Sequence, residues 1–469
     1  MTVRTPAYDR DRLRVGVVHL GVGAFHRSHQ QTYWDAIAAA GDLDWGVCGV
    51  GLLPAETALR DAAHARDGRY TLVTTAPDGT RRAQVIGSLI RYLHAPDDPA
   101  AVLDALADPA TRIVSLTITE GGYGIDDATG AFAPRDPLTL ADLDHPDRPP
   151  SSAFGYLAVA LRRRRDTGIP PFTILSCDNI QHNGDVTRAA LTAFTRRHDP
   201  SLADWIAGEV AFPCTMVDRI TPVTTDRTRA MVRDDYGIDD PWPVAAEEFR
   251  QWVVQDDFPA GRPHLAAVGV ELVPDVAPYE KLKLRILNAS HQALAHLGML
   301  AGHTWVHEAV TDPVIAGIVR RYLTDEAVPT LDPLPGTDPL AYGAQVLDRF
   351  AGAAVADRLD RIAVDASDRI PKFLLPVVRD QLAAGGPIDV AALVLAAWGV
   401  SMQRRGTAVV DRAAPDLLAA VAQEDERPGA LLDLTPVFGE LGADERLRRA
   451  YCRAREALLR DGVAESSRL

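Results

Sequence analysis

Lysine is scarce in this chain, and the few lysines that remain are candidates for proton transfer. Of the 49 basic residues only Lys281, Lys283 and Lys372 are lysines. Two of them lie in the stretch Tyr279-Glu280-Lys281-Leu282-Lys283-Leu284-Arg285-Ile286-Leu287-Asn288-Ala289-Ser290-His291. A desolvated lysine can lose its proton near neutral pH, whereas arginine stays charged. The stretch therefore predicts a general base; the alternative is that the three lysines are chance survivors of a bias toward arginine.

A helix that begins near Pro278 is predicted to carry these groups. Its apolar residues recur at helical spacing at Leu284, Leu287, Leu294 and Leu297. With Lys283 at zero and ~100° per residue, Glu280 falls near ~60°, His291 near ~80° and Asn288 near ~140°. The first two of these leucines share the arc and would desolvate the lysine, while the asparagine amide can donate to an oxygen that becomes negative. The alternative is a solvated helix whose glutamate pairs with a neighbouring lysine.

Strands alternating with helices are predicted to hold the rest of the site. Apolar runs predict buried strands at 15–20, 45–51, 112–118 and 172–176. Such alternation predicts an α/β fold with a mostly parallel, doubly wound sheet, whose ligand lies at the carboxyl ends of the strands. From about Pro278 onward the chain is predicted to be mostly helical, with apolar-periodic segments at 284–300, 341–355, 373–382 and 391–402.

The turn Gly21-Val22-Gly23 after the first strand predicts a dinucleotide site, because its backbone can approach a pyrophosphate closely. His26 replaces the third glycine of the usual GxGxxG pattern, so a purely structural turn stays an alternative. Just past the second strand, Glu56 is the expected acceptor for the adenosine ribose hydroxyls, although it could equally be a solvated residue in the first turn of a helix. A carboxylate there would repel a ribose phosphate and favours NAD over NADP.

Composition limits the class of protein. A chain of 469 residues is expected to form two domains. A net charge of −15 disfavours nucleic acid and anionic membranes as partners. Four scattered cysteines without a CxxC pair indicate reduced thiols in a cytosolic protein. We find neither the apolar core of a signal peptide nor the ~20 apolar residues of a membrane span, and we expect a cytoplasmic protein with a small-molecule partner.

Five stretches together carry a resemblance to a known family. They are Gly21-Val22-Gly23-Ala24-Phe25-His26-Arg27-Ser28-His29-Gln30, Thr117-Ile118-Thr119-Glu120-Gly121-Gly122-Tyr123, Ser176-Cys177-Asp178-Asn179, Met216-Val217-Asp218-Arg219-Ile220-Thr221-Pro222, and Lys283 to His291. Over essentially its whole length the chain resembles the polyol-specific long-chain dehydrogenases, the mannitol dehydrogenase family. The resemblance implies a metal-independent, monomeric oxidoreductase with a Rossmann-type domain at 1–280, a mostly helical catalytic domain at 281–469, and an active site in the cleft between them.

The resemblance also implies roles for single residues. The catalytic lysine falls on Lys283, the oxyanion-binding asparagines fall on Asn179 and Asn288, and the active-site histidine falls on His291. Asp218 falls near the nicotinamide, Glu280 on a proton path and Glu56 on the ribose carboxylate. We expect NAD as the cofactor, contacting Gly21, Gly23 and Phe25.

The substrate is expected to be a neutral polyol, D-mannitol giving D-fructose first, with D-arabinitol and D-sorbitol as further substrates. The resemblance places Arg361 on a substrate-contacting arginine, while Arg369 stands where the family usually has lysine. A planar bidentate donor matches a carboxylate, which keeps a hexuronate reductase acting on fructuronate or tagaturonate as an alternative. The swap could also follow from the chain's general replacement of lysine by arginine.

Two further interpretations are weaker. A non-catalytic NAD-sensing protein would have no chemical need for the full set of lysine, asparagines and histidine. His303 and His307 stand four residues apart beside Glu308, but Thr304 occupies the glutamate position of an HExxH zinc site. We therefore expect no metal there.

Overall fold

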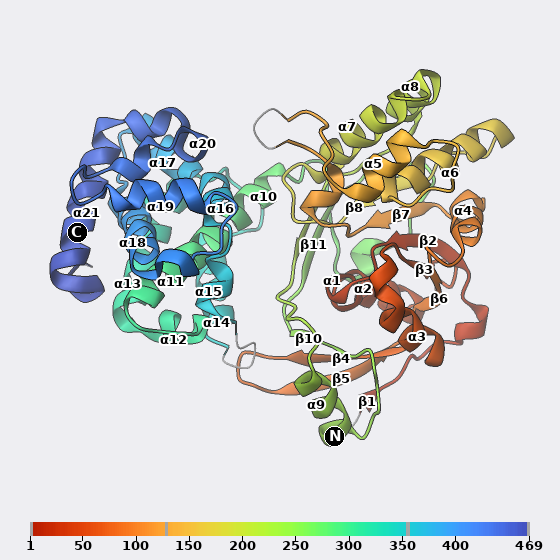
Figure 1. The fold of residues 1–469 in the computed structure, drawn as a ribbon. Helices are drawn as coiled ribbons and strands as arrows, with labels where there is room; N and C mark the ends of the chain where they lie inside the picture. Colours follow the sequence, from red (N-terminus) through yellow and green to blue (C-terminus); the bar gives the residue numbers. More distant parts are fainter. Residues whose placement is uncertain (1–2, 127–129, 353–356, 467–469) are drawn as a thin grey trace. The chain divides into compact units, whose positions relative to one another are not determined.

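The computed structural model describes residues 3–126, 130–352 and 357–466, and Figure 1 colours the chain along its sequence. The chain forms two compact units. The first comprises residues up to Ala76 with Thr80–Ala277, and the second comprises Pro77–Gly79 with the chain from Pro278 onward. The domain boundary expected after residue 280 falls inside helix α10 (Ala277–Lys283).

In its described residues, the first unit contains three sheets and the helices that cover them. Its strands are β1 (Val3–Arg4), β2 (Val15–Leu20), β3 (Gly46–Gly51), β4 (Tyr70–Thr75), β5 (Arg81–Ile86), β6 (Leu89–His94), β7 (Ile113–Leu116), β8 (Thr173–Ser176), β9 (Thr215–Asp218), β10 (Val244–Glu247), β11 (Gln251–Gln255) and β12 (Glu271–Val273). Its α-helices are α1 (Ala24–Ser28), α2 (Gln30–Ala39), α3 (Thr57–Ala65), α4 (Pro99–Ala107), α5 (Pro137–Asp144), α6 (Ala153–Thr167), α7 (Asn183–Arg196), α8 (Pro200–Glu209) and α9 (Asp226–Tyr236).

The main sheet is parallel throughout, with the order β6-β3-β2-β7-β8. The predicted strands at 15–20, 45–51, 112–118 and 172–176 are β2, β3, β7 and β8, so the prediction of a doubly wound parallel sheet is confirmed. Chain order reverses between β2 and β7, and ligands of such sheets bind where the order reverses. Two mixed sheets, β1-β5-β4-β10 and β12-β11-β9, complete the unit.

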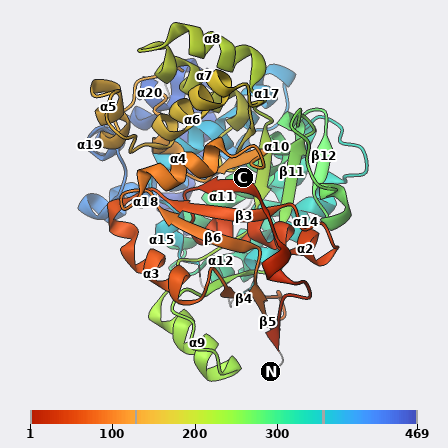
Figure 2. The same cartoon turned by 90° about the vertical axis from the view of Figure 1, so that its right-hand side faces the viewer.

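Alternation along the strands divides the apolar residues between the two faces of this sheet. In β2, Val18 and Leu20 join a core formed with α4, α6 and α7, whereas Val17 joins a second core formed with α2 and α3. Figures 1 and 2 show these two helix layers on opposite sides of the strands. Both faces are buried, which explains why the strands read as nearly continuous apolar runs.

The second unit is helical, as predicted. Its α-helices are α10, α11 (Ala289–Leu300), α12 (Val306–Thr311), α13 (Pro313–Arg321), α14 (Pro339–Phe350), α15 (Leu359–Ile362), α16 (Ala366–Phe373), α17 (Leu375–Ala384), α18 (Asp389–Arg405), α19 (Ala414–Ala422), α20 (Thr435–Phe438) and α21 (Glu445–Ser466). Two π-helical segments, η5 (Leu284–Asn288) and η6 (Tyr322–Ala327), interrupt this pattern. The segment expected at 341–355 corresponds to α14, and its end beyond residue 352 lies outside the described residues. Within the described ranges, no helix is long and apolar enough to cross a bilayer.

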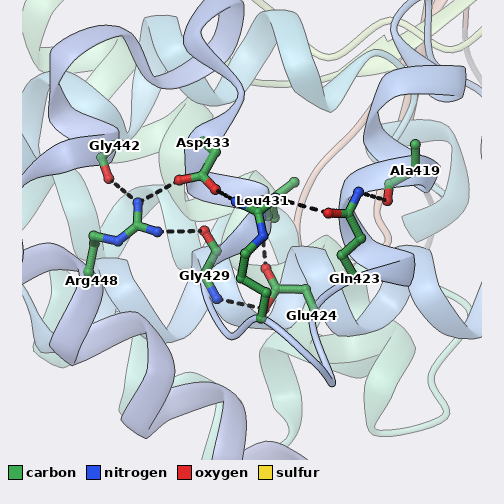
Figure 3. A network of polar contacts seen from close by, with 9 residues as sticks. Ala419, Gln423, Glu424, Gly429, Leu431, Asp433, Gly442 and Arg448 are labelled. Atoms are coloured by element: carbon green, nitrogen blue, oxygen red, sulfur yellow. Dashed lines mark hydrogen bonds and ion pairs between the residues drawn. The ribbon is translucent and has the colours of Figure 1, made fainter.

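A buried carboxylate fastens α21 to the segment before α20. Glu424 accepts hydrogen bonds from the backbone N–H groups of Gly429 at 3.0 Å and Leu431 at 2.8 Å. Arg448 of α21 donates to the carboxylate of Asp433 at 2.8 Å and to the carbonyl of Gly429 (Figure 3). Because these polar groups, of which Glu424 is buried, satisfy one another, the network has a structural role.

A buried histidine in the second unit predicts a pH-dependent stability. His296 of α11 is 1 % exposed, and burial lowers its pKa to about 3. The unfolded chain binds this proton below about pH 6.5, so the histidine should reduce stability as the pH falls from there toward 3. His296→Asn should remove this dependence. Measured by urea unfolding, the free energy of unfolding of the variant minus that of the parent should increase by about 1.4 kcal/mol for each pH unit as the pH is lowered from 6 to 4. A difference that stays constant with pH would contradict the account.

Candidate active site

The glycine turn closes directly on the end of β2. Gly21 has φ 91°, and its N–H donates to the carbonyl of Val50 at 2.9 Å. A Cβ at this position would lie 2.2 Å from the carbonyl oxygen of Thr117, so only glycine fits. A Cβ at Gly23 would meet only the Gly21 carbonyl, at 3.9 Å, which leaves the surface of the turn open. Phe25 is partly exposed beside it. The turn can therefore admit a flat or anionic ligand against its backbone.

His26, which replaces the third glycine, points into the protein. Its ring is buried and stacks on the ring of His19 of β2, with centroids 3.3 Å apart. The two nitrogens of His19 contact the hydroxyls of Ser115 at 2.8 Å and Thr117 at 2.9 Å, both on the chain of β7 or its exit. Burial lowers the pKa of His19 to about 3, so the ring is neutral. The residue at the position of the third glycine is therefore a buried packing residue, and its stacking partner is His19.

Glu56 lies over the end of β3. A Cβ on Gly51 would be 3.1 Å from Oε2 of Glu56, and the same oxygen accepts from the N–H of Leu53 at 2.9 Å. The carboxylate thus caps its own short helical turn and also stands at the strand end where a ribose acceptor was expected. Glu56 can therefore be both a residue of the first helical turn and the acceptor for the adenosine ribose.

Asn179 is an exposed residue just beyond the end of β8, and its neighbour Asp178 fixes the local backbone. The Asp178 carboxylate accepts from the N–H groups of Ile118 at 2.9 Å and Thr119 at 3.0 Å, and from the hydroxyl of Tyr123 at 2.7 Å. Thr119 has φ 63°, a strained value for a β-branched residue. Burial raises the pKa of Asp178 to about 6. This carboxylate joins the loops after β7 and β8, and sequence reasoning assigned it no role.

Asp218 ends β9 and is 5 % exposed. It lies close to His29, whose pKa is lowered to about 3 chiefly by burial, an effect that the Asp218 carboxylate partly opposes. The ring of His29 stacks on Phe25 with centroids 5.0 Å apart. The predicted cofactor residues at the end of β2 and Asp218 are therefore neighbours within the first unit.

Among the three lysines only Lys283 is buried, at 7 % exposure. Nζ of Lys281 lies 2.9 Å from the carboxylate of Asp332, and Nζ of Lys372 lies 2.8 Å from that of Asp368, both as partly exposed ion pairs. Lys281 and Lys372 therefore have ordinary surface roles. The burial of Lys283, at the end of α10, is what a lysine base requires.

The helix that carries the predicted catalytic residues is not a continuous α-helix. Between α10 and α11 the segment η5 is π-helical and ends at Asn288. The wider turn rotates Asn288 and His291 relative to Lys283 from the positions expected at α-helical spacing, so the predicted angles beyond Lys283 are wrong. Such π turns occur often at functional sites. The ring of His291 stacks on Phe350 of α14 at 3.9 Å.

Arg369 and Arg361 have different surroundings. Arg369 of α16 donates to the carbonyl of Ile362 at 2.8 Å, and α16 packs against η5 and α11. Arg361 is exposed, and its guanidinium is held in a bidentate pair by Asp357, with Nε 2.7 Å from Oδ1. The structure therefore places Arg369 on a helix that packs against the π turn, and it pairs the exposed Arg361 with the carboxylate of Asp357.

His303 and Glu308, two of the residues considered for a metal, have other partners. Nε2 of His303 lies 3.1 Å from the carboxylate of Asp312, and the Glu308 carboxylate accepts from the N–H groups of Thr304 and Trp305. In the part of the chain that the structure describes, no three His, Cys, Asp or Glu side chains are grouped as metal ligands.

Comparison with known proteins identifies the family. Residues 15–267 match the family model described as the mannitol dehydrogenase Rossmann domain, and residues 275–459 match that of the mannitol dehydrogenase C-terminal domain. The chain is 41 % identical to mannitol 2-dehydrogenase of Cereibacter sphaeroides, over 98 % of this chain and 97 % of that protein.

Two solved structures are similar over nearly the whole chain. The ternary complex of Pseudomonas fluorescens mannitol 2-dehydrogenase with NAD and D-mannitol matches at 41 % identity and a TM-score of 0.88, covering 99 % of this chain and 96 % of that one. A substrate-free D-sorbitol dehydrogenase matches at 37 % identity and a TM-score of 0.91, covering 99 % and 97 %. The predicted family is thus confirmed by full-length matches, and the chain belongs to the mannitol dehydrogenase family.

Proposed function

We propose that this protein is an NAD-dependent, metal-independent polyol dehydrogenase that interconverts a sugar alcohol and a ketose, with D-mannitol and D-fructose as the first pair. The observation that carries the proposal is the burial of Lys283 at the edge of a π turn, in a chain whose other two lysines are partly exposed. Relatives named for mannitol and sorbitol support the same reaction. A monomeric state and a cytoplasmic location stay predictions.

Lys283 acts as the general base in the oxidative direction. Its side chain is buried, and removal from water is the condition under which a lysine can serve as a base near neutral pH. Neutral Lys283 accepts the proton of the substrate hydroxyl, and the same lysine returns it during ketose reduction. Glu280, 7 % exposed and three residues earlier on α10, passes the proton onward.

Asn179 and Asn288 stabilise the alkoxide that forms as the proton leaves. Each can donate an amide N–H to an oxygen whose charge grows in the transition state. His291 orients the substrate hydroxyl, and its stacking on Phe350 limits the motion of the ring. When Lys283 accepts the proton and the two asparagines stabilise the alkoxide, no step needs a metal ion as a Lewis acid.

The first unit fits a dinucleotide. The open surface at Gly23 would admit the pyrophosphate, and Gly21 would allow the tight turn that presents this surface. The carboxylate of Glu56 would accept hydrogen bonds from the adenosine ribose hydroxyls. When bound, NAD would accept the hydride from the carbinol carbon. Asp218, near Phe25 and His29, would border the nicotinamide.

Glu56→Gln should weaken the preference for NAD over NADP. The glutamine carbonyl can still accept from the N–H of Leu53, so the capping contact survives while the charge that repels a ribose phosphate is lost. Like charges in contact cost several kcal/mol, so the ratio of kcat/KM for NAD to that for NADP should fall at least about tenfold. An unchanged ratio would show that the carboxylate only caps its turn. The neighbouring exposed substitution Ala55→Ser serves as a control.

Asp178→Asn should impair turnover through the position of Asn179. The amide nitrogen cannot accept a hydrogen bond, so one of the contacts to the loop after β7 is lost. A displacement near 1 Å costs about 100-fold, so kcat should fall about 10- to 100-fold, with KM for the ketose changed much less. Tyr123→Phe, which removes one donor and keeps the carboxylate, should lose less. If Asp178→Asn and the parent had equal kcat, Asp178 would not position Asn179 for the reaction.

The substrate class can be tested with one panel. Oxidation of D-mannitol, D-arabinitol and D-sorbitol with NAD, and reduction of D-fructose, D-fructuronate and D-tagaturonate with NADH, should show the highest kcat/KM for the D-mannitol and D-fructose pair. A strong preference for a uronate would make Arg369 a carboxylate anchor and the protein a hexuronate reductase. Absence of turnover with all of them, despite NAD binding, would favour the NAD-sensing alternative.

A further inference from the structure

The first unit has a cavity whose lining includes no residue of the glycine turn. It has a volume of about 410 Å³ and is bordered by β1, β5, α2 and the segments after β9 and before β11. Figure 1 shows β1, β5 and the adjoining β4 and β10 at the lower part of this unit. The charged residues in its lining are Arg4, Asp35, Arg82, Arg219, Glu248 and Arg250. Its volume falls within the ~300–1,000 Å³ typical of small-molecule sites.

Two arginines in this cavity have no carboxylate partner. Arg219 is 7 % exposed and donates to the carbonyl of Glu247 from Nε at 2.9 Å and Nη2 at 2.7 Å, and from Nη1 to the carbonyl of Ser28. Arg250 is half-buried; it donates to the hydroxyl of Thr32, and its Cζ lies 4.2 Å from the Tyr33 ring centroid. Among the described residues, no carboxylate oxygen lies within 4.0 Å of either guanidinium. Charges removed from water are normally paired, so this arrangement is unusual.

The two guanidinium groups also repel each other. Burial, and after it the charge of Arg250, lowers the pKa of Arg219 to about 10, and the carboxylate charge of Glu247 partly opposes this shift. In a chain of net charge −15, a cavity with excess positive charge runs against the overall composition. A bound anion would relieve the repulsion.

The other charged groups of the lining leave this excess in place. Arg82 and Glu248 form an ion pair, and Arg4 donates to the side chain of Gln84 at 3.1 Å. The carboxylate of Asp35 accepts from the Tyr8 hydroxyl and from the N–H of Gly87 at 2.8 Å. The lining therefore holds four arginines against two carboxylates, and the excess of positive charge remains.

We propose that this cavity binds a phosphate-type oxyanion, held by N–H groups of Arg250 and Arg219 that the protein itself does not use. The planar guanidinium fork matches two oxygens of such an anion, and donors from separate segments suit an anion with several oxygens. The carbonyl contacts of Arg219 and the ring beneath Arg250 hold both groups in place before binding. The volume exceeds that of a free ion, which leaves room for a small sugar attached to the phosphoryl group.

Calorimetric titration of the full-length protein tests the proposal. The probes are inorganic phosphate and D-glucose 6-phosphate, with D-glucose and sodium chloride at matched ionic strength as controls. The parent should bind a phosphate probe saturably, and Arg250→Gln should weaken that binding at least about tenfold, because a charge-assisted bidentate contact is lost. Arg250 is only half-buried, so this variant is preferred to one at the structural Arg219. Arg227→Gln, at an exposed residue outside the cavity, should bind like the parent.

The outcomes separate the sources of the anion. Tighter binding of D-glucose 6-phosphate would indicate a phosphorylated metabolite, and equal or tighter binding of inorganic phosphate would indicate the free ion; both support the site. Absence of saturable binding, or binding that Arg250→Gln leaves unchanged while circular dichroism shows a folded variant, would overturn it. The result is independent of dehydrogenase activity.

Discussion

Lys283→Ala should lower kcat for ketose reduction by about 10²–10⁴-fold, the range in which a positioned acid or base contributes. The reason is local: among the three lysines only Lys283 is buried, and it ends α10 directly before the π turn. Because the substitution removes the proton donor and not the binding surface, KM for D-fructose should change far less than kcat. Steady-state kinetics in both directions would measure the effect.

Lys281→Ala and Lys372→Ala are matched controls. Each breaks a partly exposed ion pair, with Asp332 or Asp368, and surface pairs contribute only about 0–1 kcal/mol. Both variants should keep kcat within about threefold of the parent. If Lys281→Ala and Lys283→Ala lost activity equally, the assignment of the base would be wrong.

Asn179→Ala and Asn288→Ala should each lower kcat by about 10²–10³-fold, as expected when one donor to a developing oxyanion is removed. The two residues come from different segments, the exit of β8 and the end of η5, so similar losses would point to a shared role in chemistry. The double variant should be less active than either single one. Affinity for NADH should stay near the parent value, and this serves as the internal control. A single variant with near-parent kcat would remove that asparagine from the oxyanion site.

Much of the first unit could be predicted because its signals are local. The runs that became β2, β3, β7 and β8 are apolar on both faces, and Gly21 occupies a position where any side chain would collide with the backbone. The strand β6 was not predicted, because Leu89–His94 mixes polar and apolar residues and is recognisable mainly through its pairing with β3.

The π turn at η5 could not be predicted, since its residues suit an α-helix equally well. What distinguishes it is packing, with α14 and α16 against the same segment, and packing is decided by residues distant in the sequence. The angles predicted for Asn288 and His291 are wrong for this reason, whereas the family resemblance selects Lys283 without them.

Two signals in the sequence were available and unused. The chain contains only three asparagines, Asn179, Asn183 and Asn288, and Asn183 is the buried residue that ties the exits of β8 and the start of β9 together through Thr215. Asp357 stands four residues before Arg361, the spacing of a helical ion pair, and the two do pair. The role of Asp178, by contrast, depends on contacts with Ile118 and Thr119 that only the folded sheet creates.

The most direct test of the central claim is NADH oxidation by the purified protein after exhaustive treatment with a chelator, with D-fructose as the substrate. The account predicts sustained turnover that added divalent metal does not increase, with D-mannitol as the product. Loss of turnover on chelation and its recovery with metal would contradict a lysine-based mechanism.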